Sequence, residues 1–201
     1  MASIIEHFDS LPDPRREHRK EHKLIDIIFI TIAAVICGAD DWYEIEDYGI
    51  YKQDWLKTIL ELPGGIPSHD TFNRVFSILD PVALQQCFIS WVQSIAKITE
   101  GQLISIDGKR MCNSGEQGSK ALIHMVSAWS NANGMVLGQQ KINDKSNEIT
   151  AIPALLDLLM VKGCWISIDA MGCQKDIAAK INEKEAVYIL AVKDNQKHLH
   201  G

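Results

Sequence analysis

The sequence predicts a mixed α/β protein, with an all-helical region over residues 1–100 followed by a sheet and flanking helices over 101–201. Three observations support this. Helix start and stop signals recur throughout the first region. The pattern of apolar residues changes near "TEGQ". After it the apolar runs become short and rich in Ile and Val, as is typical of strands. Strand and helix patterns then alternate, which is typical of mixed α/β sheets.

Turn formers and caps set the first three predicted helices. "IIEHFDSL" begins as a short amphipathic helix and stops at "PDP". The apolar helix 23–38 ends at Gly38, a good C-terminal stop. The next helix, 40–60, opens with Asp40 or Asp41 as its N-cap.

Two more helices follow the break at "LPGGIP". Ser68 is the expected N-cap of the first, and Asp70 lies in its first turn, where the helix dipole favours an acid. The second helix, 80–98, has Asp80 as its cap and Pro81 at its first position.

The sheet region begins with an apolar strand and a hairpin. The Asn-Gly pair in "SNANGM" predicts a tight turn between two antiparallel strands. The expected elements, in order, are strands at about 103–107, 122–130 and 135–142, a helix from Asn147, a strand at 164–169, a helix at 173–184 and a strand at 186–192.

Composition narrows the class of protein. With 201 residues, 46% apolar and 23% charged, the chain has room for one large or two small soluble domains. The longest apolar stretch, 24–39, carries Asp26 and falls short of a membrane span, so a buried helix is expected and membrane association is the alternative. The N-terminus lacks a secretory pattern, and the five cysteines form no CxxC pair. A reduced, cytoplasmic setting without a zinc knuckle is the expectation.

The net charge of −6 argues against a nucleic-acid partner, but it hides a basic run, "PDPRREHRKEHK". Such a run is either a solvated helix face or a phosphate-binding patch, and charge alone leaves both open. The cations that would contact DNA there are Arg15, Arg16, Arg19 and Lys20.

A doubled phrase carries the strongest chemical signal. "LISIDGKR" and "WISIDAMG" each place one aspartate, Asp107 or Asp169, at the end of an apolar run. A buried carboxylate is costly unless it is paired, and two of them on adjacent strands predict a shared divalent cation. Mg²⁺ or Mn²⁺ suits oxygen ligands and can activate a water or a 3′-hydroxyl. The glycine after Asp107 leaves room for a phosphate backbone.

A simpler interpretation stays open for each aspartate. An aspartate at the end of a strand is often a turn former or a helix N-cap, and Asp169 comes shortly before the helix at 173. Spacing alone does not decide between this and a metal ligand.

Several separated blocks resemble one family. They are "HKLIDIIFITIAAVICGADDWYEIEDYG", "GIPSHDTFNRVF", "LISIDGKRM", "KSNEITAIPALLDLL", "ISIDAMGCQKDIAAKI" and "YILAVKDNQ". Together, over about residues 5–197, they resemble the H-repeat-associated insertion-sequence transposases of the DDE class. The resemblance implies an RNase H-like catalytic fold for 101–201 and the family's helical N-terminal domain, with a role at the element's ends, for 1–100.

The resemblance also implies a catalytic site. In the family an Asp-Asp-Glu triad binds two Mg²⁺ ions for DNA strand cleavage and transfer, and Asp107 and Asp169 match its two aspartates. The family's glutamate lies beyond Gly201, and Glu148 does not match it. We therefore expect a truncated transposase, inactive by itself. DNA, both element ends and target, is the implied partner; a homo-oligomer stays open.

Other expectations remain beside this one. Lys109 and Arg110 either contact phosphate next to Asp107 or are solvated strand-end charges. A DNA-binding remnant without enzymatic activity, which competes with intact transposase, is the second functional hypothesis. An inert fragment with an incomplete sheet is the third.

Overall fold

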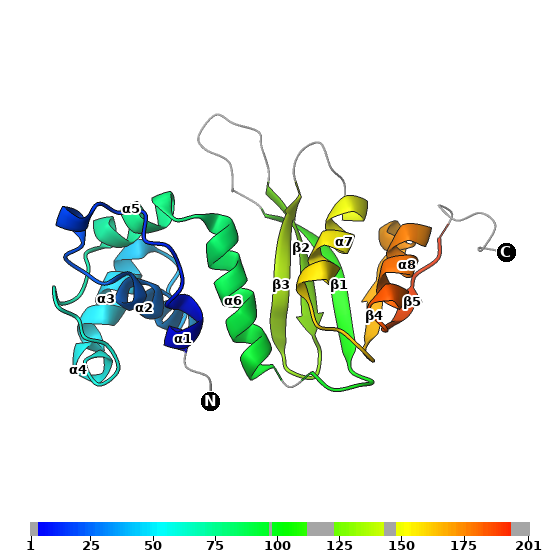
Figure 1. Ribbon diagram of the computed structural model, residues 1–201, viewed down its shortest axis with the longest axis horizontal. Helices are drawn as coiled ribbons and strands as arrows, with labels where there is room; N and C mark the ends of the chain where they lie inside the picture. Colours follow the sequence, from blue (N-terminus) through cyan, green and yellow to red (C-terminus); the bar gives the residue numbers. More distant parts are fainter. Residues whose placement is uncertain (1–3, 97, 112–122, 143–147, 194–201) are drawn as a thin grey trace. The chain divides into compact units, whose positions relative to one another are not determined.

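The computed structural model describes residues 4–96, 98–111, 123–142 and 148–193. It divides the chain into two compact units, Met1–Trp91 and Val92–Gly201 (Figure 1). The division lies inside a helix, whereas the sequence places the change of texture a few residues later, near 100. Each unit is described below by itself.

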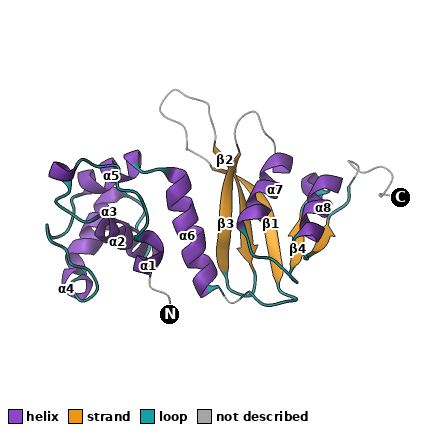
Figure 2. Cartoon of the chain, in the orientation of Figure 1, coloured by secondary structure: helices purple, strands orange, loops and turns teal. Residues whose placement is uncertain are grey.

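The described part of the first unit contains helices and no strand (Figure 2). One interpretation of the basic run was a solvated face of a helix. In the structure the run contains one 3₁₀ turn, η1, in place of a regular α-helix. The elements are α1 (Ile4–Phe8), η1 (Glu17–Arg19), α2 (Leu24–Ile36), α3 (Trp42–Tyr51), α4 (Gln53–Leu56), α5 (His69–Ile78) and α6 (Pro81–Ile95), which continues into the second unit.

Side-chain caps begin three of these helices, as the sequence predicts. Asp41, rather than Asp40, caps α3, and its carboxylate accepts a hydrogen bond from Glu44 N at 2.9 Å. Ser68 Oγ accepts from Thr71 N at the start of α5, and Asp80 Oδ1 accepts from Val82 N at the start of α6. Each cap satisfies a backbone N–H that the first helical turn leaves unpaired.

The prediction of one continuous helix over 40–60 is wrong. The chain leaves helical geometry at Lys52, which separates α3 from the short α4. This break turns α4 so that Leu56 is fully buried while Lys57 stays exposed. Burial of one leucine side chain contributes about 1.5–3 kcal/mol, which is more than the few tenths that helix propensity offers per residue.

The apolar stretch from 24 to 39 forms α2, a buried helix, which confirms that interpretation. Ile27, Ile28 and Ile30 are at most 1% exposed, and they pack in one core with Phe72 and Val75 of α5. In the described ranges no single helix is long and apolar enough to cross a membrane; α5 and α6 reach that length only together, with a 102° bend between them.

The second unit contains a five-stranded sheet in the order β3-β2-β1-β4-β5. The sequence predicts all five strands, and the Asn-Gly turn joins β2 to β3 as expected, with Gly134 at a positive φ of 62°. The elements are β1 (Leu103–Met111), β2 (Ile123–Ser130), β3 (Met135–Ile142), α7 (Glu148–Leu158), β4 (Trp165–Ile168), η2 (Ala170–Gly172), α8 (Lys175–Glu183) and β5 (Val187–Leu190).

Among the described elements, helices cover one face of this sheet and leave the other open. Helix α7 packs on β2 and β3, α8 packs on β5, and the two helices contact each other, so both lie on the same face (Figure 1). The side chains under them are buried, as Ile104 and Ile166 are. On the opposite face Leu103, Trp165 and Val187 form one row across β1, β4 and β5, and each is more than a third exposed.

Candidate functional site

The two ISID phrases lie side by side in the sheet. Strands β1 and β4 are parallel, and Ile104 pairs with Ile166 and Ile106 with Ile168. Asp107 and Asp169 therefore occupy equivalent positions one residue further along, on strands that lie about 4.8 Å apart. The predicted meeting of the two phrases in one sheet is confirmed.

The serines inside the phrases mark the face of the sheet concerned. Ser167 Oγ donates to Ser105 Oγ at 3.2 Å, so both serines lie on the open face of the sheet. Because side chains alternate along a strand, Asp107 shares that face with Ser105. The carboxylate of Asp107 thus projects from the side of the sheet that no helix of the described chain covers.

The two aspartates differ in their local structure. Asp169 directly follows β4, as predicted, but Asp107 lies within β1, which continues to Met111 because β2 pairs with it over that whole length. The prediction of a strand end at Asp107 is therefore wrong. The backbone of Asp107 pairs with that of Ser127.

Asp169 is also a helix cap, the simpler role that the sequence left open. Its Oδ1 atom accepts hydrogen bonds from Met171 N at 3.1 Å and Gly172 N at 3.4 Å, at the start of η2. Its second oxygen accepts none from the described residues. The cap fixes the direction of this carboxylate and leaves one oxygen for a ligand.

Both carboxylates are exposed, so the interpretation of Asp107 and Asp169 as buried acids is wrong. The near-continuous apolar runs suggested strands covered on both faces. Among the described elements, helices cover only the isoleucine face; the serines and Asp107 alternate onto the other one. No desolvation cost therefore needs an ion to offset it.

The donor set fits part of a centre for a hard divalent cation. Carboxylate oxygens are the ligands that Mg²⁺ and Mn²⁺ prefer, and Asp107 and Asp169 occupy equivalent positions on neighbouring chain segments. In the part of the chain that the structure describes, no His, Cys, Asp or Glu joins the pair to make a group of three. Lys109 lies two residues beyond Asp107 on the same face, exposed and without an ion pair to any described residue. Arg110 is placed by its backbone, which pairs with that of His124.

The basic run is largely occupied by internal contacts. Arg15 binds Asp13 through two hydrogen bonds, of 2.9 and 2.8 Å, and donates a third to the carbonyl of His22 at 2.9 Å. The Arg15 side chain is only 6% exposed. Burial alone would raise the pKa of Asp13, but hydrogen bonds from Arg15 and the charges of Arg15 and Lys20 outweigh it and lower that pKa. This largely buried ion pair is therefore an internal contact of the fold.

The other cations of the run differ from Arg15. Lys20 forms ion pairs with Glu17 and Asp13. Arg16 is exposed and has no ion pair within the described ranges, and Arg19 ends η1. Among the predicted DNA-contacting residues of the helical unit, Arg16 is therefore better placed than Arg15 or Lys20 to reach a phosphate.

Sequence reasoning missed one ordered polar cluster. Glu46 Oε2 accepts hydrogen bonds from His69 N at 2.8 Å and His69 Nδ1 at 2.7 Å, and Tyr43 stacks on the His69 ring at 4.1 Å. The backbone hydrogen bond from His69, followed by that from its side chain, lowers the pKa of Glu46. The cluster ties α3 to α5. Because 23 residues separate its members, no local pattern could have indicated it.

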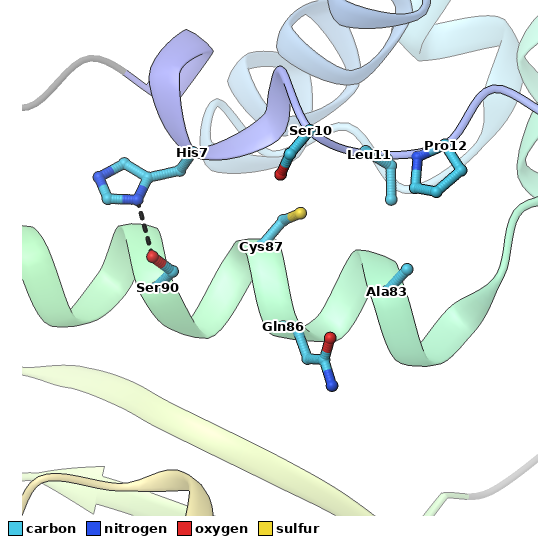
Figure 3. A pocket seen from close by; sticks show the side chains of 8 residues that line it. All are labelled: His7, Ser10, Leu11, Pro12, Ala83, Gln86, Cys87 and Ser90. Atoms are coloured by element: carbon cyan, nitrogen blue, oxygen red, sulfur yellow. Dashed lines mark hydrogen bonds between the residues drawn. The ribbon is translucent and has the colours of Figure 1, made fainter.

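A hollow of about 380 Å³ lies between the N-terminal segment and α6 (Figure 3). His7 Nδ1 and Ser90 Oγ are hydrogen bonded across it at 2.9 Å, and the Cys87 thiol and Ser10 hydroxyl also line it. No lysine, arginine, aspartate or glutamate lines this hollow. It therefore lacks the carboxylates that a metal-dependent reaction needs.

Comparison with known families defines the class. Residues 93–200 match the family described as Transposase DDE domain, and residues 5–92 match the domain described as DDE_Tnp_1-associated. The first match covers more than half of the chain. This chain belongs to the DDE transposase family.

Individual relatives narrow the group. The chain is 53% identical over 201 residues to "Putative transposase YncI" of Escherichia coli O157:H7 and spans 52% of that protein. It is 52% identical to the YncI protein of strain K12, of which it spans 81%. It is 44% identical to "H repeat-associated putative transposase YhhI" of strain K12, of which it spans 53%. The chain thus belongs to the H-repeat-associated group of the DDE transposase family, as its sequence blocks predicted.

The chain spans about half the length of the first YncI relative and of YhhI. A solved piggyBac transposase synaptic complex with hairpin DNA aligns with a TM-score of 0.45 at 15% identity, over 92% of this chain and 46% of that one.

Proposed function

We propose that this chain carries two of the three acidic ligands of a metal-dependent centre for DNA strand cleavage and transfer. Asp107 and Asp169 are the metal ligands in this proposal, and Mg²⁺ or Mn²⁺ is the ion. The observation that carries it is the parallel register of β1 and β4, which brings the two aspartates to equivalent positions at the open face. Membership of the DDE transposase family supports the same assignment.

Each residue of the proposed site has a separate role. Asp107, held within a paired strand, supplies a carboxylate of fixed position. Asp169, held by two N–H groups at Oδ1, supplies its other oxygen. Asp107 and Asp169 would hold the divalent ion, which would supply activation of a water or a 3′-hydroxyl and charge stabilisation of the leaving oxygen. Lys109, on the same face, is placed to contact a DNA phosphate.

Metal binding tests this assignment directly. Titration of the chain with Mn²⁺, followed by the EPR signal of the free ion, should show one class of sites. Asp107→Asn and Asp169→Asn should each weaken it by at least about tenfold, since each removes one charged ligand. Asp176→Asn, which neutralises an exposed aspartate of α8 in the same unit, is the matched control. Equal affinity in all four proteins would refute the assignment.

We expect residues 1–201 alone to show little or no strand cleavage, because two carboxylates are one fewer than the family's triad. Nicking of a supercoiled plasmid with Mg²⁺ measures this. Efficient nicking by the chain that Asp107→Ala abolishes would overturn the expectation of inactivity and would leave the assignment of Asp107 intact.

A DNA-binding remnant without catalysis is the second candidate. It is favoured by Arg16 and Lys109, exposed cations without ion pairs to described residues. Mobility shifts on duplexes that carry the ends of the encoding element should weaken as salt rises. Arg16→Glu should weaken them by at least about tenfold if the run contacts phosphate. Arg15→Gln should instead lower the stability of the fold, because it removes the hydrogen-bonded cation of the largely buried Asp13 and leaves only the more distant Lys20.

A further inference from the structure

The helical unit has a second hollow, of about 300 Å³, where the end of α2 meets α3. Ala34 and Ala39 give it an apolar floor, and two carboxylates and two tyrosine rings give it polar and aromatic walls. The wall residues are Glu44, Asp47, Tyr48 and Tyr51. Their spacing of three and four residues places all four on one face of α3.

Two of the four wall side chains make contacts within the unit, and the other two are exposed to solvent. Glu44 Oε2 accepts a hydrogen bond from Asp40 N at 2.7 Å, which fixes that carboxylate at the helix start. Burial, and then a hydrogen bond with the Cys37 thiol, raises the pKa of Tyr48, which keeps it neutral. Asp47 is exposed and has no hydrogen bond or ion pair to the described residues, and Tyr51 is 86% exposed.

The two helices that form the hollow also carry exposed apolar side chains. Ile36 at the end of α2 is 71% exposed, and Ile50 of α3 is 55% exposed. Exposed aromatic and aliphatic groups are common at protein contact sites.

The charge of the unit indicates the sign of its partner. Residues 1–91 carry eight lysines and arginines against fifteen aspartates and glutamates, a formal charge of −7. Residues 92–201 carry twelve against eleven, a formal charge of +1. The carboxylates that line the hollow have the same sign as this net charge, and both favour a cationic partner at the hollow. No lysine or arginine of the described residues lines this hollow to neutralise the charge of its carboxylates.

We propose that this hollow is a docking site for an arginine side chain from a basic segment of a partner protein. The guanidinium would pair with Asp47 and stack on Tyr51, while its aliphatic stem would lie on the alanine floor. The site is independent of the two aspartates of the sheet, so it stands or falls separately from the metal-dependent centre.

Binding of a model peptide tests the proposal. The probe is a fluorescein-labelled peptide of four Gly-Arg repeats, with a citrulline peptide of the same length as its neutral twin, measured by fluorescence anisotropy on the full 201-residue chain. The arginine peptide should bind and the citrulline peptide should not. Asp47→Asn should weaken binding about tenfold, the loss expected for one charged hydrogen bond. Tyr51→Ala should weaken it about threefold, whereas Tyr51→Phe should retain it.

A matched control separates docking from general attraction. Asp9→Asn removes the same charge from an exposed position of the same unit that does not line the hollow, and it should change the affinity less than about twofold at 0.15 M salt, where distant charges are screened. Equal losses from Asp9→Asn and Asp47→Asn would overturn the proposal. Equal binding of the arginine peptide and the citrulline peptide would also overturn it.

Cys37 provides a readout at the site itself. This thiol is exposed and lines the hollow, while the other free cysteines of the described ranges are buried. Saturating arginine peptide should slow its alkylation by iodoacetamide, followed by mass spectrometry of the Cys37 peptide. An unchanged alkylation rate at saturation would place the peptide elsewhere and reject this site.

Discussion

The helical unit and the sheet unit use their aspartates in opposite ways. In the helical unit Asp26 is 1% exposed within an apolar core, and one of its oxygens has no partner among the described residues. In the sheet unit Asp107 and Asp169 are exposed, although apolar strand residues surround them in the sequence. An apolar context along the chain therefore does not decide whether a carboxylate is buried. What decides it is the face that the side chain occupies and whether another element covers that face.

The largest effect is expected in the core of the helical unit. Phe72→Ala removes a fully buried ring that packs with α2, and it should lower the free energy of unfolding by about 3–5 kcal/mol. Urea titration followed by far-UV circular dichroism measures this. Phe88→Ala, at a 39% exposed ring of α6, should cost clearly less. Equal losses would mean that the core of the helical unit is not where this stability resides.

Gly172 of the sheet unit and Gly49 of the helical unit differ in how much space surrounds them. A Cβ on Gly172 would collide with the Ile168 side chain of β4 and come within 3.2 Å of Ile152 Cδ1 of α7. Gly172→Ala should therefore cost about 1–3 kcal/mol by overpacking. A Cβ on Gly49 of α3 would come within 2.7 Å of a methyl of Ile66, so Gly49→Ala should cost less. The reverse order in thermal or urea unfolding would contradict the close packing behind the Asp169 turn.

Asp169 allows its two roles to be separated. Asp169→Ala removes the cap of η2 and should cost about 0.5–2 kcal/mol, whereas Asp169→Asn keeps an acceptor oxygen and should cost less. Both variants should lose Mn²⁺ affinity, because both lose the charge. If Asp169→Asn binds Mn²⁺ like the wild type, the carboxylate has only its structural role.

Asp26 should give the smallest effect, a change in the pH dependence of stability. Desolvation, partly opposed by the hydrogen bond from Leu62 N, raises the pKa of Asp26 above its ordinary value of 3.8. The folded protein therefore holds this proton more tightly than the unfolded chain does. The resulting stabilisation is complete below 3.8 and is lost as pH rises through the raised pKa.

Asp26→Asn should remove that dependence. The difference in unfolding free energy, wild type minus Asp26→Asn, should fall as pH rises from 3.8 towards neutrality, by about 1.4 kcal/mol for each unit by which folding raises the pKa. Urea titrations at several pH values measure it. The charged groups near Asp26, which are His22, Lys23 and Glu61, remain in both proteins, so their titration cancels. A difference that rises with pH would show that the folded protein favours the charged form.

Much of the fold could be predicted from the sequence because its signals are local. Asp41, Ser68 and Asp80 act as caps within three residues of their partners, and the Asn-Gly turn fixes the β2–β3 hairpin. The apolar patterns indicated the strands. The family blocks indicated an H-repeat-associated DDE transposase, and the family matches bear this out.

The remaining features of the fold depend on groups that are distant in sequence. The length of β1 past Asp107 is set by pairing with β2, and the break at Lys52 accompanies the burial of Leu56. The largely buried Arg15–Asp13 pair shows that a cation in a basic run can be occupied internally. The order of residues along the chain shows that two aspartates end matching apolar phrases. Only the coverage of one face of the sheet decided that they are exposed, because burial depends on which elements pack together and not on the residues next to them in the chain.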